Sequence, residues 1–350
     1  MRRHCFGEKI PMTPFSIGVD LGGTNLRIAA YSQDLGLLET ILLPTRLAAG
    51  RNAVVDDMCD AILRLLKTHG AGRELMGIGI GTPGPLELPE GKLHSPPNLP
   101  GWDGFELRRR IEGILGQQVT LESDANLAAL AECMLGRGRS LGIDSLCMLT
   151  LGTGIGNGII LGGRVWHGTT GMAGEAGHMT IWPEGPACGC GSNGCLEMYA
   201  SATAVNRLAR EAIVADAKGI AALADMPGGI TARELAKLAE SGDQDAKGVF
   251  DLAGRALGIG LAGLVNTLNL PLYVVGGGLA NAWDLLSPSL FAEVHRRSYV
   301  YRLTQPGGAA ANGTRIMPAE LGADSGLLGA CILPFTLADR SPIRSTAVNV

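Results

Sequence analysis

The sequence predicts an α/β protein of two related lobes, each built on a mixed β-sheet flanked by helices. Three observations support this prediction: the glycine content, the alternation of short apolar strands with amphipathic helices, and a pattern found once in each half. The 350 residues include 52 glycines, roughly twice the usual share, without a collagen-like period. In each half, a strand ends in a glycine–threonine turn and leads into a hairpin. Because sheets and helices bury their apolar faces against each other, this order indicates two layered lobes around a cleft.

The first half begins with a predicted meander of three strands, followed by alternating helices and strands. Strands are expected at 15–20, 26–31, 39–44, 76–81 and 118–122, and helices at 53–69, 105–115 and 124–135. The first strand leads directly into Leu21-Gly22-Gly23-Thr24.

The second half repeats the same order. Strands are expected at 145–151, 158–161, 164–166, 272–275 and near 314–319, and helices at about 196–212, 231–241, 244–268 and 324–332. We expect a small lobe over 15–123 plus about 323–340, a large lobe over 124–322, and an N-terminal extension without regular structure over 1–14. Glycine clusters at 22–23, 81–84, 152–158, 189–194 and 276–278 are expected to lie nearly all at strand ends or in a cysteine-rich loop, where the chain turns sharply or approaches a ligand.

Composition and charge exclude several classes of protein. A hydrophobic fraction of 46% and a charged fraction of 18% exclude a disordered chain. The formal net charge of −4 argues against a nucleic-acid-binding surface. The uncharged run between Arg255 and Asp284 is long enough to cross a membrane, but Asn266 and Pro271 interrupt it, which favours a buried helix, strand and turn. The N-terminus lacks the apolar stretch of a signal peptide, so we expect a cytoplasmic protein.

Asp20 and the residues after it are the first segment with a chemical interpretation. Gly22 and Gly23 permit a tight turn whose N–H groups can face a phosphate, and Thr24 adds a hydroxyl donor. Asp20, at the strand end, can hold a hydrated Mg²⁺. The segment lacks the lysine of a Walker loop and opens a hairpin, so an ordinary hairpin turn is the alternative.

A second turn of this kind, Gly152-Thr153-Gly154, begins the second half. Small residues at a strand end suit a backbone cradle for anionic oxygens, although a simple glycine-rich turn is the alternative. One such turn in each lobe predicts a nucleotide held between the lobes.

Asp124 follows a predicted strand and opens a helix. Such an aspartate is a good N-cap, and in a cleft it is also a natural general base for a hydroxyl that attacks a phosphoryl group. Both interpretations remain open at this stage.

A short cysteine-rich loop is the most specific feature of the chain. His178 precedes Cys188, Cys190 and Cys195, a Cys₃His set typical of a closed structural zinc site. Disulfides are not expected in a cytosolic chain, and two cysteines in a CxC sequence are poorly placed to bridge each other. Glu175 and Glu197 flank the loop and would be held close to it as acceptors for sugar hydroxyls.

Together these segments resemble the ROK family of sugar kinases, repressors and open reading frames. Asp20–Arg27 is similar to the DxGGTxxR motif of the family, and Ser123–Asn126 to its NDAN motif. Glu175–His178 matches ExGH, and Cys188–Glu197 matches CxCGxxGCxE in full. The resemblance extends over nearly the whole chain, from about Ile17 to Leu333.

The resemblance implies a two-lobed, actin-like (ribonuclease H-like) ATPase fold with a zinc-stabilised loop. It implies phosphorylation of the 6-hydroxyl of a hexose by Mg-ATP in a homodimer, with Asp124 as the catalytic base. The implied sugar-binding residues are Asn98, Ser123, Asp124, Glu175, His178 and Glu197. The implied ATP-binding residues are Asp20, Gly22, Gly23, Thr24, Gly152, Thr153, Gly154, Gly276, Gly277 and Gly278, with the glycine triplet under the adenosine. The implied zinc ligands are His178, Cys188, Cys190 and Cys195.

Ser123 departs from the family pattern, which has an asparagine before the catalytic aspartate. That asparagine contacts a sugar hydroxyl in the family, whereas serine is shorter and offers one donor instead of two. We therefore expect the catalytic step to be kept and the sugar selectivity to differ.

Glucose is the expected substrate, and mannose, fructose and N-acetylated hexosamines are the alternatives, since they differ by single substituents. A sugar-sensing regulator without its DNA-binding domain is an alternative of another class, because only about 16 residues precede the strand that leads into the first phosphate motif, too few for the three helices of such a domain. An actin-like or chaperone-like ATPase is a third alternative, which the cysteine loop and the ExGH motif disfavour.

Overall fold

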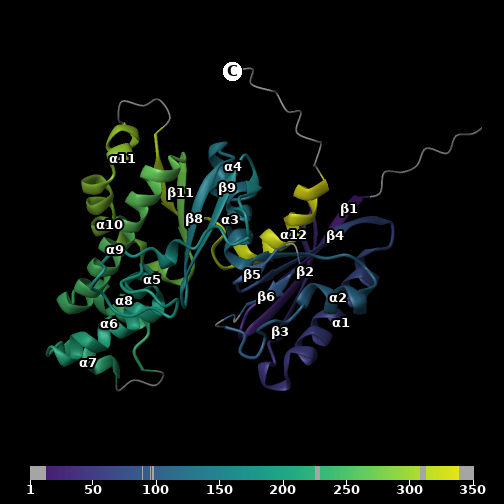
Figure 1. Ribbon diagram of the computed structural model, residues 1–350, viewed down its shortest axis with the longest axis horizontal. Helices are drawn as coiled ribbons and strands as arrows, with labels where there is room; N and C mark the ends of the chain where they lie inside the picture. Colours follow the sequence, from purple (N-terminus) through teal and green to yellow (C-terminus); the bar gives the residue numbers. More distant parts are fainter. Residues whose placement is uncertain are drawn as a thin grey trace, which may run out of the picture. The chain divides into compact units, whose positions relative to one another are not determined.

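The protein forms two compact units, each with one five-stranded mixed sheet (Figure 1). A computed structural model describes residues 13–88, 90–94, 96, 98–224, 229–307 and 313–338. Unit 1 consists of the chain up to Asp124 and from Leu327 onwards, and unit 2 consists of Ala125–Gly326. Most of the expected N-terminal extension lies outside the described residues. Its last two residues, Thr13 and Pro14, were wrongly assigned to the extension, because they begin the first strand.

The sheet of unit 1 has the strand order β3-β2-β1-β4-β7. The three strands of the predicted meander pair antiparallel, and β4 and β7 add to β1 in parallel. The bounds are β1 Thr13–Leu21, β2 Asn25–Ser32, β3 Gly36–Pro44, β4 Arg73–Thr82 and β7 Thr120–Ser123, and a small separate hairpin is formed by β5 Leu86–Glu87 and β6 Lys92–Leu93. The carboxyl ends of β1, β4 and β7 therefore lie along one edge of the sheet.

Helices cover both faces of this sheet. One face packs against α1 (Arg51–His69) and α2 (Leu107–Leu115) through a continuous apolar core. The opposite face packs against α12 (Ser325–Ala338). A short 3₁₀ helix, Leu47–Ala49, precedes α1.

Glycines inside the strands allow α12 to lie directly on the sheet. A Cβ atom at Gly18 would overlap the backbone of Cys331, and one at Gly79 would overlap the carbonyl group of Ala330. Two residues before Gly18 on β1, the hydroxyl of Ser16 donates a hydrogen bond of 2.6 Å to the Cys331 carbonyl oxygen. A strand glycine thus marks a close backbone approach here.

The sheet of unit 2 repeats the topology of the first, with the order β10-β9-β8-β11-β12. The strands β8, β9 and β10 form an antiparallel meander, and β11 and β12 follow β8 in parallel. The bounds are β8 Leu146–Leu151, β9 Ile155–Leu161, β10 Arg164–Val165, β11 Leu272–Gly276 and β12 Arg315–Pro318. The two lobes with mixed sheets predicted from the sequence are confirmed.

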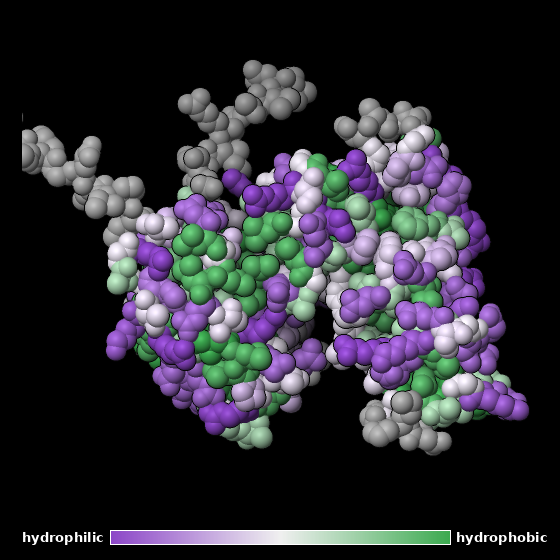
Figure 2. All heavy atoms as spheres, turned by 180° about the vertical axis from the view of Figure 1, so that it is seen from behind, coloured by the Kyte–Doolittle hydropathy of each residue, from purple (hydrophilic) through white to green (hydrophobic). Residues whose placement is uncertain are grey.

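One face of the second sheet packs against a large helical layer, whose central member is α9. The helices of unit 2 are α3 Asp124–Met134, α4 Arg137–Leu141, α5 Glu197–Ala200, α6 Ala202–Val214, α7 Lys218–Ala224, α8 Ala232–Glu240, α9 Gln244–Leu268, α10 Trp283–Arg297 and α11 Tyr299–Thr304, with 3₁₀ turns at Ala176–His178, Gly278–Ala282 and Gly322–Asp324. Hydrophilic residues are interspersed with smaller apolar areas on the face drawn in Figure 2.

The helix α9 belongs to this core, as predicted for the uncharged run. Among the described helices it alone is long and apolar enough to cross a membrane, and 67% of its most apolar window is buried inside the protein. The chain then continues into β11 and a glycine turn.

The other face of the second sheet receives α3, again above glycines. A Cβ atom at Gly158 would overlap Ala129 and the carbonyl oxygen of Ala125. Further along α3, the fully buried carboxylate of Glu132 accepts hydrogen bonds from the backbone N–H groups of Glu320 (2.9 Å) and Leu321 (2.7 Å). These contacts hold α3 between β9 and the segment that precedes α12.

One helical expectation differs from the structure. The single helix expected at about 196–212 is divided at Ser201, whose extended backbone ends α5 and whose hydroxyl caps α6 by accepting from Ala204 N. The helices α4, α7, α10 and α11 were not predicted, and α10 contains Pro288. Its buried residues nevertheless follow helical spacing, with Leu286 and Leu290 one turn apart.

Replacing Gly79 by alanine is expected to lower the free energy of unfolding by about 1–3 kcal/mol, because the new methyl group must displace α12. Gly263→Ala is the matched control, since Gly263 lies in α9 and a methyl group added there would meet nothing within 4 Å. The control should be neutral or stabilising by up to about 1 kcal/mol. Chemical unfolding measures both, and a Gly79→Ala protein as stable as the control would contradict the packing argument.

Candidate functional site

In unit 1 the predicted residues gather at the carboxyl edge of the parallel strands. Asp20 pairs with Gly81 between β1 and β4, and Thr82 pairs with Ser123 between β4 and β7. Adjacent strands lie about 4.8 Å apart, so Asp20 and Ser123 are separated by about two strand spacings. Asp124 follows Ser123 as the first residue of α3, and it is exposed. In open α/β sheets this edge is where ligands bind.

Asp20 is held by the arginine of its own motif. Arg27 is its partner across the β1–β2 hairpin, and Nη2 and Nε donate to Asp20 Oδ2 at 2.7 and 3.1 Å. The two side chains are about one fifth to one quarter exposed. The DxGGTxxR spacing therefore places the arginine directly opposite the aspartate and orients the carboxylate at the strand end.

The glycine turn after β1 lies against the segment that carries Asn98. A Cβ atom at Gly23 would come within 2.7 Å of the Asn98 carbonyl oxygen, so the close approach requires glycine. Thr45 fixes the turn from the other side, since its hydroxyl donates to Gly22 O (2.7 Å) and its N–H donates to Thr24 O (2.8 Å). The structure thus brings the predicted phosphate turn and a predicted sugar-binding residue together within unit 1.

In unit 2 the two predicted glycine turns also lie side by side. Gly276 pairs with Thr150 at the ends of β11 and β8, and a Cβ atom at Gly277 would meet the Leu151 backbone. Gly277 has a φ of 83°, which favours glycine. A pocket of about 440 Å³ opens beside these turns, with Gly152, Thr153 and Gly278 in its lining. Its volume lies in the range of small-molecule sites.

The other wall of this pocket was not predicted from the sequence. It is formed by α8 and the 3₁₀ turn after the glycine triplet, and the residues that contribute are Ala232, Arg233, Ala236, Lys237, Glu240, Leu279, Asn281 and Ala282. Lys237 is held by Glu234 at 3.0 Å. The amphipathic pattern of α8 was visible in the sequence, but no motif indicated that its polar face borders a pocket.

The four predicted metal ligands form one cluster. The ligand atoms of His178, Cys188, Cys190 and Cys195 lie within 4.8 Å of one another. His178 Nδ1 lies 3.6 Å from Cys188 Sγ, and the sulfurs of Cys190 and Cys195 lie 3.7 Å apart. Tetrahedral zinc with its usual bond lengths separates such atoms by about 3.6 and 3.8 Å. The donor set and its geometry therefore fit a four-coordinate metal.

The remaining described cysteines are structural. Burial raises the pKa of Cys133 and of Cys147 to about 12, so both remain protonated thiols at neutral pH. Among the described residues, the cluster of His178 with the three loop cysteines is the only group found that could hold a metal ion.

Glu175 and Glu197 lie next to the cluster. Nε2 of His178 faces Glu175 at 3.9 Å, while its Nδ1 faces the cysteines. Partial burial raises the pKa of Glu175, the charge of His178 acts in the opposite direction, and Glu197 raises the pKa further. Glu197 Oε2 accepts a 2.7 Å hydrogen bond from Ile155 N, and this bond connects the cysteine loop to the Gly152–Gly154 turn.

Two sheets of equal strand order, each with a glycine turn at a strand end, define an actin-like ATPase fold. The chain belongs to the ROK family, whose sequence model matches residues 16–336.

Relatives of known name agree with this assignment. The chain is 35% identical to the glucokinase of Halalkalibacterium halodurans, over 89% of this chain and 92% of the relative. The ROK hexokinase from Thermus thermophilus superimposes with a TM-score of 0.75 at 36% identity, over 93% of this chain and 100% of that structure. The ROK glucokinase from Streptomyces griseus, solved with glucose and AMPPNP, has a TM-score of 0.73 at 31% identity, over 91% and 98% of the two chains.

Proposed function

We propose that this protein transfers the γ-phosphoryl group of ATP to the 6-hydroxyl of glucose. The proposal is supported by its similarity to proteins named glucokinase and hexokinase over about nine tenths of the chain. The observation that carries it is the arrangement of Asp20, Ser123 and Asp124 at one edge of the first sheet. There, a phosphate turn lies two strands from an exposed carboxylate.

Asp124 acts as the general base in this proposal. Its carboxylate accepts the proton of the 6-hydroxyl while that oxygen attacks the γ-phosphorus, and the bond to the β-phosphate oxygen breaks to release ADP. The base is exposed and begins α3, so its position depends on how α3 rests on Gly158 of β9. The nucleotide is bound by the pocket beside Gly152, Thr153 and Gly278.

In this proposal Asn98, Glu175, His178 and Glu197 bind the hydroxyls of the sugar, and Ser123 takes the place of an asparagine at one of them. Glucose is proposed because a relative solved in complex with glucose matches the chain over 91% of its length. The homodimer and the cytoplasmic location that the family implies remain predictions.

The cluster of His178, Cys188, Cys190 and Cys195 would hold zinc, and Asp20 would bind the Mg²⁺ of Mg-ATP through water. Zinc with four protein ligands is structural. It would fix His178 and the loop that ends at Glu197, and thereby orient the Nε2 side of the imidazole towards the sugar.

Asp124→Asn should lower kcat by about 10²- to 10⁴-fold, because the amide cannot accept the proton of the sugar hydroxyl. A coupled assay of ADP release measures the rate, and calorimetry with glucose should show unchanged sugar binding. The control is Asp34→Asn, an exposed aspartate in the turn between β2 and β3, which should leave kcat unchanged. If Asp124→Asn were as active as Asp34→Asn, Asp124 would not be the general base.

Sugar selectivity is expected to follow residue 123. Ser123→Asn restores the longer side chain of the family and its second hydrogen-bond donor. It should raise the ratio of kcat/KM for glucose to kcat/KM for mannose by about tenfold, because one hydrogen bond contributes a free energy of about that size. The ADP-release assay over glucose, mannose, fructose and N-acetylglucosamine gives this ratio. An unchanged ratio would show that residue 123 does not contact the discriminating hydroxyl.

Purified protein should contain about one zinc ion per chain by elemental analysis, as expected for a closed four-ligand site. Cys190→Ala should lose most of the metal and lower the melting temperature, whereas Cys59→Ala, in α1 and outside the cluster, should keep its zinc. Zinc well below one ion per chain in freshly prepared protein would contradict the site.

A further inference from the structure

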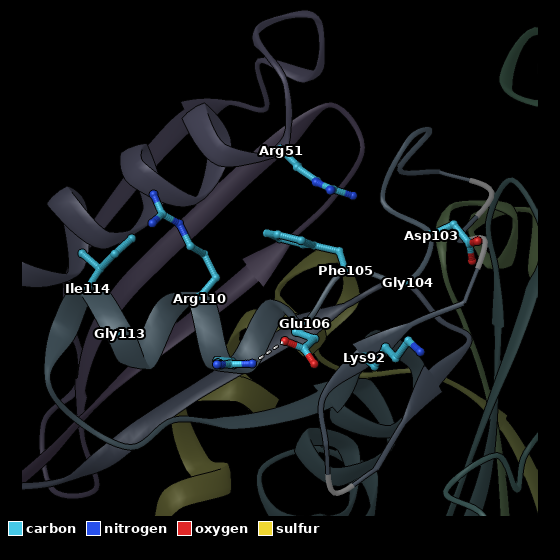
Figure 3. A pocket seen from close by; sticks show the side chains of 10 residues that line it. Arg51, Lys92, Asp103, Gly104, Phe105, Glu106, Arg110, Gly113 and Ile114 are labelled. Atoms are coloured by element: carbon cyan, nitrogen blue, oxygen red, sulfur yellow. Dashed lines mark hydrogen bonds and ion pairs between the residues drawn. The ribbon is translucent and has the colours of Figure 1, made fainter.

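Unit 1 contains a second cavity that the proposed reaction does not use. It has a volume of about 600 Å³ and lies between the start of α1, the exposed face of α2 and the loop before α2 (Figure 3). The lining residues of α2 and its N-cap, Glu106, Arg109, Arg110 and Gly113, follow each other at helical spacing, so they lie on one face of the helix.

The lining is rich in cations. Arg51, Lys92, Arg109 and Arg110 contribute positive charge, and Asp103 and Glu106 contribute negative charge, which leaves a formal net charge of 4 − 2 = +2. This balance is opposite in sign to the −4 of the whole chain. A basic cavity on an acidic protein favours an anion.

The arginines are not locked by their partners. Arg109 pairs with Glu106 at 3.2 Å and is 83% exposed, and Arg110 pairs with Asp56 at 2.8 Å and is 42% exposed. Exposed ion pairs contribute about 0–1 kcal/mol, so a doubly charged ligand can compete for these guanidinium groups. Guanidinium groups bind phosphate with two parallel hydrogen bonds.

Arg51 connects the cavity to the segment that carries Asn98. Its guanidinium carbon lies 4.7 Å from the centre of the Phe105 ring, and Nη1 donates to Gly101 O at 3.1 Å. In the view of Figure 3, Phe105 lies between Arg51 and Glu106. The ring of Phe105 packs edge-on against the buried ring of Trp102, with 5.4 Å between the ring centres. This contact anchors the loop that precedes α2.

The cavity is bordered by an exposed glycine inside α2. Gly113 lines the cavity, and a Cβ atom added there would meet nothing within 4 Å. A glycine costs a helix interior about 1 kcal/mol relative to alanine, and neither a positive φ nor a packing contact requires one here.

We propose that this cavity is a regulatory site for a small organic phosphomonoester that carries hydroxyl groups. The arginines bind the phosphate, the carboxylates of Asp103 and Glu106 accept from hydroxyls, and Phe105 and Ile114 supply apolar surface for the carbon skeleton. The cavity is larger than inorganic phosphate requires and lies in the range of small-molecule sites. A bound phosphate draws Arg51 away from Gly101 O, loosens the Asn98 segment and raises the KM for the sugar. This regulatory effect rests on the proposed function, whereas the binding does not.

Calorimetry on the full chain, with sn-glycerol 3-phosphate as the probe, tests the binding. Wild type is expected to bind one probe molecule per chain. Gly113→Gln fills the cavity and Arg109→Gln removes a phosphate donor, so each should weaken binding at least tenfold. Gly263→Gln is the control for a glutamine at an exposed, open helical glycine, and it should bind like wild type.

Equal binding by the Gly113→Gln and Gly263→Gln proteins would place the probe elsewhere and overturn the proposal, as would the absence of binding to wild type. Malate, a dicarboxylate of similar size, should bind at least tenfold more weakly, and equal affinity would overturn the assignment to phosphate. In the kinase assay the probe should raise the KM for glucose in wild type and Gly263→Gln but not in Gly113→Gln. Binding is measured without turnover, so an inactive protein that binds the probe would refute the proposed function and leave the site standing.

Discussion

The close approach of two helices to two sheets is the constraint on which the functional geometry depends. The helix α12 lies on Gly18 and Gly79, and α3 lies on Gly158, at places where even a methyl group would overlap the helix. For α3 this approach fixes the helix on β9, and the first residue of α3 is Asp124, the proposed general base. Glu132 strengthens the arrangement, because its buried carboxylate accepts hydrogen bonds from the backbone N–H groups of Glu320 and Leu321.

Local sequence signals predicted the fold well where each element has its own pattern. The strand that ends in a glycine turn and leads into a hairpin identified both sheets, and their equal strand order confirmed the duplication. The glycines inside β1 and β4 were predicted as parts of strands, but the packing of α12 on them was not. A glycine in a strand looks the same in sequence whether it faces a ligand, a turn or a helix more than two hundred residues away, as Gly79 faces Ala330.

The candidate site was predictable to the extent that its residues are close in sequence. The cysteine loop with His178 was identified from spacing alone, and the register of β1 and β2 explains why the arginine of the first motif must lie seven residues after Asp20. The contribution of α8 to the pocket beside the Gly152–Gly154 turn depends on tertiary packing, and so does the hydrogen bond between Glu197 and Ile155. No short pattern encodes them, because an amphipathic helix has the same sequence signature beside a pocket as beside bulk water.

The discontinuity of unit 1 has a consequence for how the protein is made. Its sheet is complete once Ser123 has been synthesised, but the face that carries Gly18 and Gly79 is covered by α12, which is synthesised only after unit 2. During translation this face stays open while about two hundred residues of unit 2 emerge and fold. Unit 2, although it comes second in the sequence, is therefore the first unit in which helices can cover both faces of the sheet.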